Sequence, residues 1–288
     1  MKQSSKNILI IPNALVDQIA AGLCVIWCGA GLSVSCGLPT WKLLILRLVQ
    51  ACENSGLSTI ELDELNRLQD SGYFDDVADF CRGFLGEPEY RELLRQLFEP
   101  RDLSSCLHEK LLDIPFSAIL TTNYDKLIEH AVANRNSKIP PVFTNRDTPT
   151  LWRRLANNEF FILKVHGDIE RPETIVLSSK DYTDHVFGNL PFIQFLQRLL
   201  TAKSVLFIGT SFTEPYILRL LEETRCLTAG VGLQHFALLP HAGIIRSRLL
   251  RDRYNVSVIN YDVAACDSQH AIAIQDLLDG IANRMAPK

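Results

Sequence analysis

Residues 25–41, with the sequence VIWCGAGLSVSCGLPTW, contain the signals that decide the fold. An apolar run over residues 23–28 ends at Gly29-Ala30-Gly31, Ser33 follows, and a Gly-Leu-Pro corner at 37–39 precedes a helical pattern. A strand, a glycine turn and a helix in this order are typical of a phosphate-binding loop, because glycines let backbone N–H groups approach an anion. The spacing is not the dinucleotide fingerprint G-x-G-x-x-G, and an ordinary turn between a strand and a helix explains it equally well.

Apolar runs alternate with helical patterns along most of the remaining chain. Continuous apolar strands between helices predict an α/β fold with a doubly wound, mostly parallel, Rossmann-like sheet. Residues 55–112 differ, because their apolar residues recur at helical spacing without a β-branched run. We therefore expect a single domain over residues 1–288, with a helical subdomain inserted at 55–112. The expected strands are residues 25–28, 116–120, 160–165, 204–208, 235–239 and 256–259, with a short extended piece at 174–177.

Polar residues directly follow three more of these strands. Asn123 and Asp125 follow the second strand, His166 follows the third, and Gly209-Thr210-Ser211 follows the fourth. Because the carboxyl ends of parallel strands form the ligand crevice of such sheets, we expect four strand ends to face one site.

Each of these residues also has a structural interpretation. His166 is a candidate general base, although a histidine at a strand end is more often structural. Asn123 and Asp125 suit contacts with a sugar or a carboxamide, and an Asx turn that caps the next helix explains them equally well. The hydroxyls and N–H groups of Gly209-Thr210-Ser211 suit a phosphate or ribose, or only an ordinary turn.

Composition excludes several classes of protein. A chain of 288 residues that is 47% hydrophobic can bury a full core, and its net charge of -4 provides no basic surface for nucleic acid. There is neither a secretory signal nor an apolar run of about 18 residues, so we expect a cytoplasmic protein that does not span a membrane. The eight cysteines include no C-x-x-C pair, which predicts reduced thiols without structural zinc or disulfides. An arginine cluster at 246–253 fits a solvated helix face better than a surface for an acidic partner.

Four motifs in a fixed order resemble the sirtuin superfamily. They are G-A-G-x-S-x-x-x-G-L-P at 29–39, T-T-N-Y-D at 121–125, K-V-H-G at 164–167 and G-T-S at 209–211. Trp41, which follows Gly-Leu-Pro-Thr, and the S-S-K-D-Y segment at 178–182 make the chain most similar to the bacterial sirtuin-like NADases of antiphage defence. The resemblance extends over residues 14–262.

The resemblance implies a role for each motif. NAD would be the substrate, with Asn123 fixing the nicotinamide ribose and the attacking water, Asp125 holding the carboxamide, and His166 serving as general base. The glycine loop would hold the diphosphate and the G-T-S loop the adenosine side. The implied catalytic residues are Asn123 and His166, and the implied NAD-binding residues are Gly29, Ala30, Gly31, Ser33, Trp41, Asp125, Gly209, Thr210 and Ser211.

Two departures from the sirtuin pattern argue against deacylation. Sirtuin deacylases carry a four-cysteine zinc module between the H-G and G-T-S motifs, and this chain has no cysteine between His166 and Gly209. Their Gly-Ile-Pro-Asp-Phe-Arg segment is Gly-Leu-Pro-Thr-Trp-Lys here, at 37–42. We therefore expect an NAD+ hydrolase without zinc. The alternatives are a structural subunit that binds NAD or ADP-ribose with little catalysis and, less favoured, a deacylase or ADP-ribosyltransferase.

An NADase must be controlled, because unregulated activity would poison its own cell. The motifs occupy most of the chain, so we expect control by homo-oligomerisation or by a second protein. Related systems pair such a subunit with a HerA-type ATPase. We expect no direct contact with nucleic acid or membrane.

Overall fold

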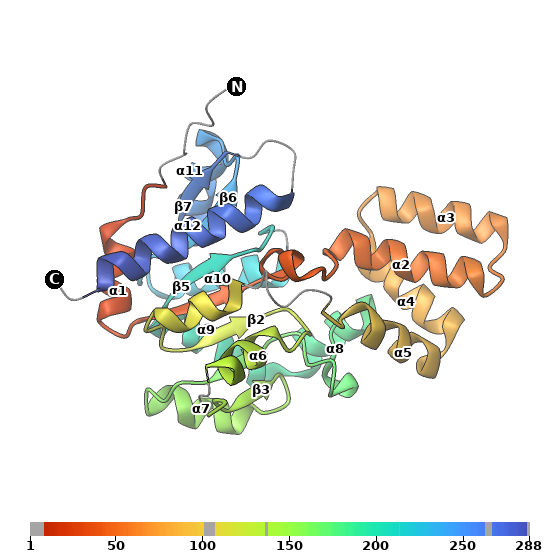
Figure 1. Cartoon of the computed structure of the whole chain (residues 1–288), viewed down its shortest axis with the longest axis horizontal. Coiled ribbons are helices and arrows are strands. Elements are labelled where there is room, and N and C mark those ends of the chain that lie inside the picture. The colour runs from red at the N-terminus through yellow and green to blue at the C-terminus, as the bar shows by residue number, and fades with distance from the viewer. Residues whose placement is uncertain (1–8, 101–106, 136–137, 213, 263–266, 287–288) are drawn as a thin grey trace.

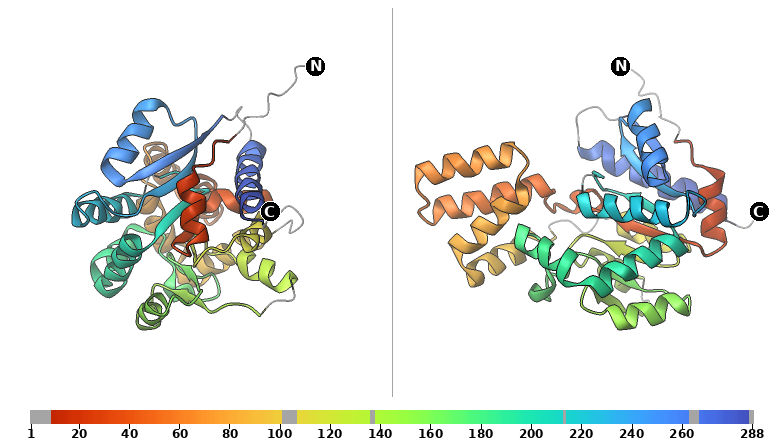
Figure 2. Two further views of the ribbon diagram at one scale, coloured as in Figure 1. Left: turned by 90° about the vertical axis from the view of Figure 1, so that its left-hand side faces the viewer. Right: turned by 180° about the vertical axis from the view of Figure 1, so that it is seen from behind.

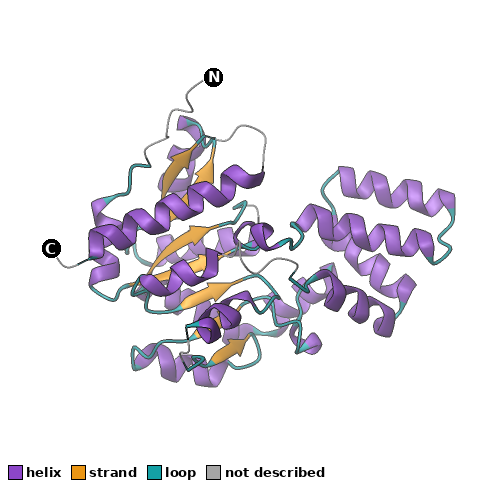
Figure 3. Ribbon diagram, in the orientation of Figure 1, coloured by secondary structure: helices purple, strands orange, loops and turns teal. Residues whose placement is uncertain are grey.

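The computed structural model describes residues 9–100, 107–135, 138–212, 214–262 and 267–286, without the side chains of 267–269. Their strands form one sheet of seven parallel strands in the order β3-β4-β2-β1-β5-β6-β7 (Figure 3). The α/β fold with a Rossmann-like parallel sheet is therefore confirmed. The strands are β1 (Cys24–Cys28), β2 (Ile119–Thr121), β3 (Val142–Thr144), β4 (Ile162–Lys164), β5 (Ser204–Ile208), β6 (His235–Pro240) and β7 (Val256–Tyr261).

The strand order creates a switch point in the centre of the sheet. From β1 the chain passes to β2 on one side, and only after β4 does it cross to β5 on the other side, where Cys28 pairs with Ile208. Ligands of such sheets bind where the connections diverge, at the carboxyl ends of the strands. The four strands for which a shared site was expected, β4, β2, β1 and β5, are neighbours in this order.

Helices cover both faces of the sheet (Figures 1 and 2). Successive side chains of a strand point to opposite faces, so Val25 and Trp27 pack in one core while Cys24, Ile26 and Cys28 pack in the other. The first core is closed by α7 (Thr148–Ala156), α9 (Leu190–Ala202), α10 (Pro215–Leu227) and α11 (Ile244–Tyr254), and the second by α1 (Asn13–Ala20), α6 (Leu127–Asn134) and α12 (Asp267–Met285).

Four further helices protrude from one end of the sheet, at the right of Figure 1. They are α2 (Trp41–Asn54), α3 (Thr59–Asp70), α4 (Phe74–Leu85) and α5 (Glu87–Leu97). Thr40 caps α2, and Ser58 and Glu61 form a capping box at the start of α3. The apolar core of these helices also contains Tyr124 and Leu177 from the sheet domain. The helices are therefore joined to the loop that follows β2.

The structure differs from the expectations in several local details. β3 was not predicted, and in the piece expected to be extended at 174–177 the first residue, Thr174, ends a 3-10 helix, Pro172–Thr174, before the chain becomes extended at Ile175. The helix α2 packs with α3 and α4, although it precedes the boundary predicted at residue 55. Cys36 is bonded in a disulfide, whereas Cys24, Cys28, Cys52, Cys81 and Cys226 are free thiols. The expectation that all cysteines are reduced is therefore wrong at Cys36.

Candidate functional site

A cavity of about 1200 Å³ opens at the carboxyl ends of β1, β2, β4 and β5. Residues from the start of α2, from α4, from α8 (Ser179–Gly188) and from the start of α10 also line it, and so do residues of β6, β7, α11 and α12. The structure brings together around this cavity every residue that the sequence proposed for the site. These are Gly29, Ala30, Gly31, Ser33, Trp41, Asn123, Asp125, His166, Gly209, Thr210 and Ser211.

Three glycines allow the loops after β1 and β5 to touch. A Cβ on Gly29 would lie 2.5 Å from the Gly209 carbonyl oxygen, and one on Gly31 would lie 2.9 Å from the Gly209 Cα. Gly209 has φ +64, and its own Cβ would lie 2.6 Å from the Leu32 nitrogen. The Gly31 N–H donates to the Gly209 carbonyl at 2.9 Å. These positions therefore require glycine for backbone contact as well as for any approach of an anion.

Hydrogen bonds of side chains connect the loop after β2 to the glycine loop after β1. The Asn123 amide donates to the Gly29 carbonyl at 3.1 Å and to Ser33 Oγ at 3.0 Å. Ser33 Oγ in turn donates to Asp125 Oδ2 at 2.9 Å, and Asp125 Oδ1 accepts the Leu127 N–H at 3.0 Å. Because the Gly29 carbonyl can only accept, the amide nitrogen of Asn123 must face it. The Asn123 carbonyl oxygen is then the end available to a ligand.

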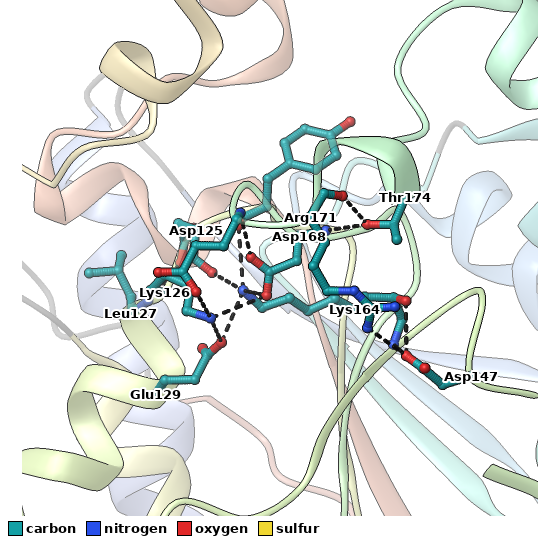
Figure 4. Close-up of polar contacts among 12 residues, drawn as sticks. Asp125, Lys126, Leu127, Glu129, Asp147, Lys164, Asp168, Arg171 and Thr174 are labelled. Atoms are coloured by element: carbon teal, nitrogen blue, oxygen red, sulfur yellow. Dashed lines mark hydrogen bonds and ion pairs between the residues drawn. The ribbon is translucent and has the colours of Figure 1, made fainter. Parts of the chain in front are cut away.

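A buried ionic cluster supports the same loop from below (Figure 4). The side chain of Lys164 is 0% exposed, and its Nζ donates to the Asp125 carbonyl at 2.6 Å. It lies 3.0 Å from both Glu129 Oε1 and Asp168 Oδ2, and Lys126 contacts the same two oxygens at 3.1 and 3.3 Å. Burial alone would raise the pKa of Asp168, but the ammonium groups of Lys164 and Lys126 hold that pKa below its usual range.

His166 projects into the cavity wall from the end of β4. Its Nε2 lies 2.7 Å from Tyr216 Oη and 3.3 Å from Glu214 Oε2. Burial, with a smaller contribution from His185, lowers the pKa of His166 well below its ordinary value, so the ring is neutral at neutral pH. Burial also raises the pKa of Glu214 to about 7.

The backbone around His166 fixes its position. The His166 carbonyl accepts the Val176 N–H at 2.8 Å. Gly167 has φ +96, and a Cβ there would lie 2.2 Å from the Thr174 carbonyl oxygen. The glycine of the K-V-H-G motif is thus required by the tight turn that presents the histidine.

Several residues of the site were not identified from the sequence. Lys164 and Tyr182 lie within quoted motifs but were given no role, and Glu214 and Tyr216 were not considered. The sequence feature that could have drawn attention to Glu214 is its position before Pro215, where a helix is expected to begin. Within the residues that the structure describes, no group of three or more His, Cys, Asp or Glu side chains is arranged to hold a metal ion. Among the helices described, none is long and apolar enough to cross a membrane.

The sequence is similar to those of several known proteins. The model of the SIR2-like domain family matches residues 117–259. The NAD(+) hydrolase ThsA of Bacillus cereus (strain MSX-D12) is 29% identical over 214 residues, which are 74% of this chain and 42% of that protein. The protein of the same name from Enterococcus faecium is 28% identical over 229 residues, 77% of this chain and 44% of that protein.

A third relative is the Defense-associated sirtuin 2 of Bacillus subtilis. It is 25% identical over 226 residues, 77% of this chain and 21% of that protein. The chain thus covers less than half the length of these curated relatives. Residues 117–259 thus match the SIR2-like domain family, and the chain is similar in sequence to NAD(+) hydrolases and to a defence-associated sirtuin.

Proposed function

We propose that this protein is an NAD+ glycohydrolase that cleaves NAD+ to nicotinamide and ADP-ribose and depletes NAD+ in defence against phage. One observation carries the proposal: Asn123, Asp125, His166 and both glycine loops meet around a single cavity at the switch point of the sheet. At about 1200 Å³ the cavity is at least as large as typical small-molecule sites, which fits a dinucleotide. The similarity to two NAD(+) hydrolases supports the same activity.

The residues of the cavity suit the chemistry of this reaction. A bond forms between the water oxygen and C1′ of the ribose, the C1′–N1 bond breaks, and nicotinamide leaves as a neutral molecule with the electron pair. No strong acid is needed, because the leaving group is neutral. The reaction instead needs an oriented nucleophile and a place for the proton that the water loses.

Each need has a candidate residue in the structure. The carbonyl oxygen of Asn123, which accepts no hydrogen bond from the described residues, accepts one from the water or a ribose hydroxyl, and the hydrogen bonds of the amide nitrogen to Gly29 and Ser33 fix its direction. The neutral ring of His166 takes up the proton. Asp125 keeps a second lone pair on each carboxylate oxygen for the carboxamide N–H groups.

The direct test is to incubate the purified protein with NAD+ and to measure the release of nicotinamide. We expect nicotinamide and ADP-ribose in equal amounts. Tight binding of NAD+ without turnover would instead support a structural subunit that binds NAD or ADP-ribose. Transfer of the ADP-ribose or removal of an acyl group from a peptide would support the transferase or deacylase alternative.

We expect Asn123→Ala to lower the rate of nicotinamide release by about a hundredfold, because one positioned hydrogen bond to the reacting groups is lost. The measurement is the steady-state rate at saturating NAD+. Asn157→Ala, at an exposed asparagine outside the cavity, is the matched control and should retain the full rate. Full turnover by Asn123→Ala would contradict the assignment of this residue.

We further propose that the enzyme acts in the cytoplasm and is controlled by self-assembly or by a partner such as a HerA-type ATPase. An apolar patch on α11 supports a contact with another chain, since Ile244, Ile245 and Leu249 are 90%, 78% and 58% exposed. Light scattering measures the assembly state of the purified protein with and without the ATPase, and the NADase assay on the same samples measures whether activity depends on that state. Full activity of a monomer would contradict control by assembly.

A further inference from the structure

Glu214 occupies an unusual position at the start of α10. Its side chain is 34% exposed and lines the cavity, yet Oε2 is buried and accepts no hydrogen bond from the described residues. A buried carboxylate oxygen without a hydrogen bond is costly to a fold. The fold keeps this oxygen beside His166, which indicates a role at that ring.

The contacts of the His166 imidazole indicate which ring nitrogen carries the proton and which one can accept a proton. Nε2 of His166 lies 3.3 Å from Glu214 Oε2 and 2.7 Å from Tyr216 Oη, so this nitrogen faces protein groups. Among the described residues no hydrogen bond is made by Nδ1. A proton on Nε2 lets the ring donate to Tyr216 Oη, points positive charge rather than a lone pair toward the nearby Glu214 Oε2, and leaves Nδ1 as the proton acceptor for a ligand.

We propose that Glu214 is a positioning residue for His166, which holds the proton of the ring on Nε2 and stabilises the imidazolium that forms when Nδ1 takes a proton from the attacking water. This inference rests on the proposed NAD+ hydrolysis. The water proton moves to Nδ1 and then to solvent, and the C1′–N1 electron pair leaves with nicotinamide. The Glu214 carboxylate gains no proton in this step and supplies the counter-charge, as the buried carboxylate of a catalytic triad does.

The ionisation of Glu214 then governs the rate. Because burial raises the pKa of Glu214 to about 7, the carboxyl is protonated and uncharged below that pH and becomes a carboxylate above it. We therefore expect kcat to rise as the pH increases from 6 to 8. The titratable groups that interact with Glu214 are His166 and the tyrosines Tyr124, Tyr182 and Tyr216. Asp75 and Arg219 line the same cavity, and His185 packs against His166 and Tyr216.

The test compares Glu214→Gln, which has the same shape but no charge, with wild type. We expect kcat at pH 8 to fall about 10- to 100-fold, the strength of a hydrogen bond to a charged group, with KM changed by less than about twofold. The rise of kcat between pH 6 and 8 should disappear in this variant and persist in part in Glu214→Asp. Glu222→Gln is the matched control, because Glu222 lies on the same helix, outside the cavity, and pairs with Arg253.

A second measurement separates this inference from the proposed function. The ring signals of His166, identified by their loss in His166→Ala, are titrated by nuclear magnetic resonance in wild type and in Glu214→Gln. Removing the anion should lower the pKa of His166 further, whether or not NAD+ is cleaved. Wild-type protein that releases no nicotinamide would refute the hydrolase, whereas an unchanged His166 pKa would overturn the role of Glu214. An active Glu214→Gln enzyme with the wild-type pH profile would overturn it too.

Discussion

His166→Ala lowers the rate of NAD+ hydrolysis by about 10²- to 10⁴-fold, the usual contribution of a general base. The variant loses the neutral imidazole to which we assign uptake of the water proton, and it keeps the backbone turn at Gly167 that follows residue 166. The measurement is the rate of nicotinamide release at saturating NAD+, combined with calorimetric binding of NAD+. We expect the rate to fall far more than the affinity, because the ring acts on the reacting water.

His130→Ala is the control for this variant. His130 is exposed on α6 and lies outside the cavity, so its loss should leave the rate unchanged. A His166→Ala protein that folds normally and turns over NAD+ at the wild-type rate would remove His166 from the catalytic residues. Circular dichroism and thermal unfolding of both variants establish that they are folded.

Lys164→Met destabilises the protein by about 3–5 kcal/mol, the cost of breaking a buried ion pair by removing one partner. The methionine fills a similar volume but leaves Glu129 and Asp168 with only the partly exposed Lys126 as a cation. Urea unfolding at pH 7 measures the loss. Lys180→Met, at an exposed lysine paired with Asp184, is the control and should leave the urea midpoint nearly unchanged.

The destabilisation by Lys164→Met should also depend on pH. The pKa of Asp168 in the folded protein lies below its ordinary value in an unfolded chain, so its ionised form contributes stability that is fully present above that ordinary pKa. This contribution is lost as the pH falls through the lowered pKa. The difference between wild type and Lys164→Met should therefore shrink in acid. A difference that stays constant down to the acid transition would show that Lys164 acts through packing alone.

The centre of the sheet was predictable because its strands are buried on both faces. All five residues of β1 and of β5 are buried, which gives the continuous apolar runs on which the prediction relied. β3 could not be found in this way, because Val142–Thr144 has only three residues, two of them partly exposed, and follows Pro140-Pro141. An edge strand this short has no hydrophobic pattern to detect.

The site was predictable only in part, for a geometric reason. His166, Asn123 and the glycine loops directly follow strands, so the rule for parallel sheets was enough to group them. Glu214 and Tyr216 reach His166 from the start of α10, which follows β5, whereas His166 follows β4. The strands β2 and β1 lie between β4 and β5, so the contact depends on a strand order that the sequence does not reveal.

Tyr124 connects the protruding helices to the loop that carries two residues of the candidate site. It stands between Asn123 and Asp125, but its ring packs in the core of α2–α5, 5.1 Å from Phe98, and its hydroxyl donates to the Val176 carbonyl at 2.7 Å. A tilt of the protruding helices must therefore pull on the backbone that carries both site residues. The packing of these helices therefore holds the backbone of Asn123 and Asp125, the residues that we propose contact the ribose and the carboxamide.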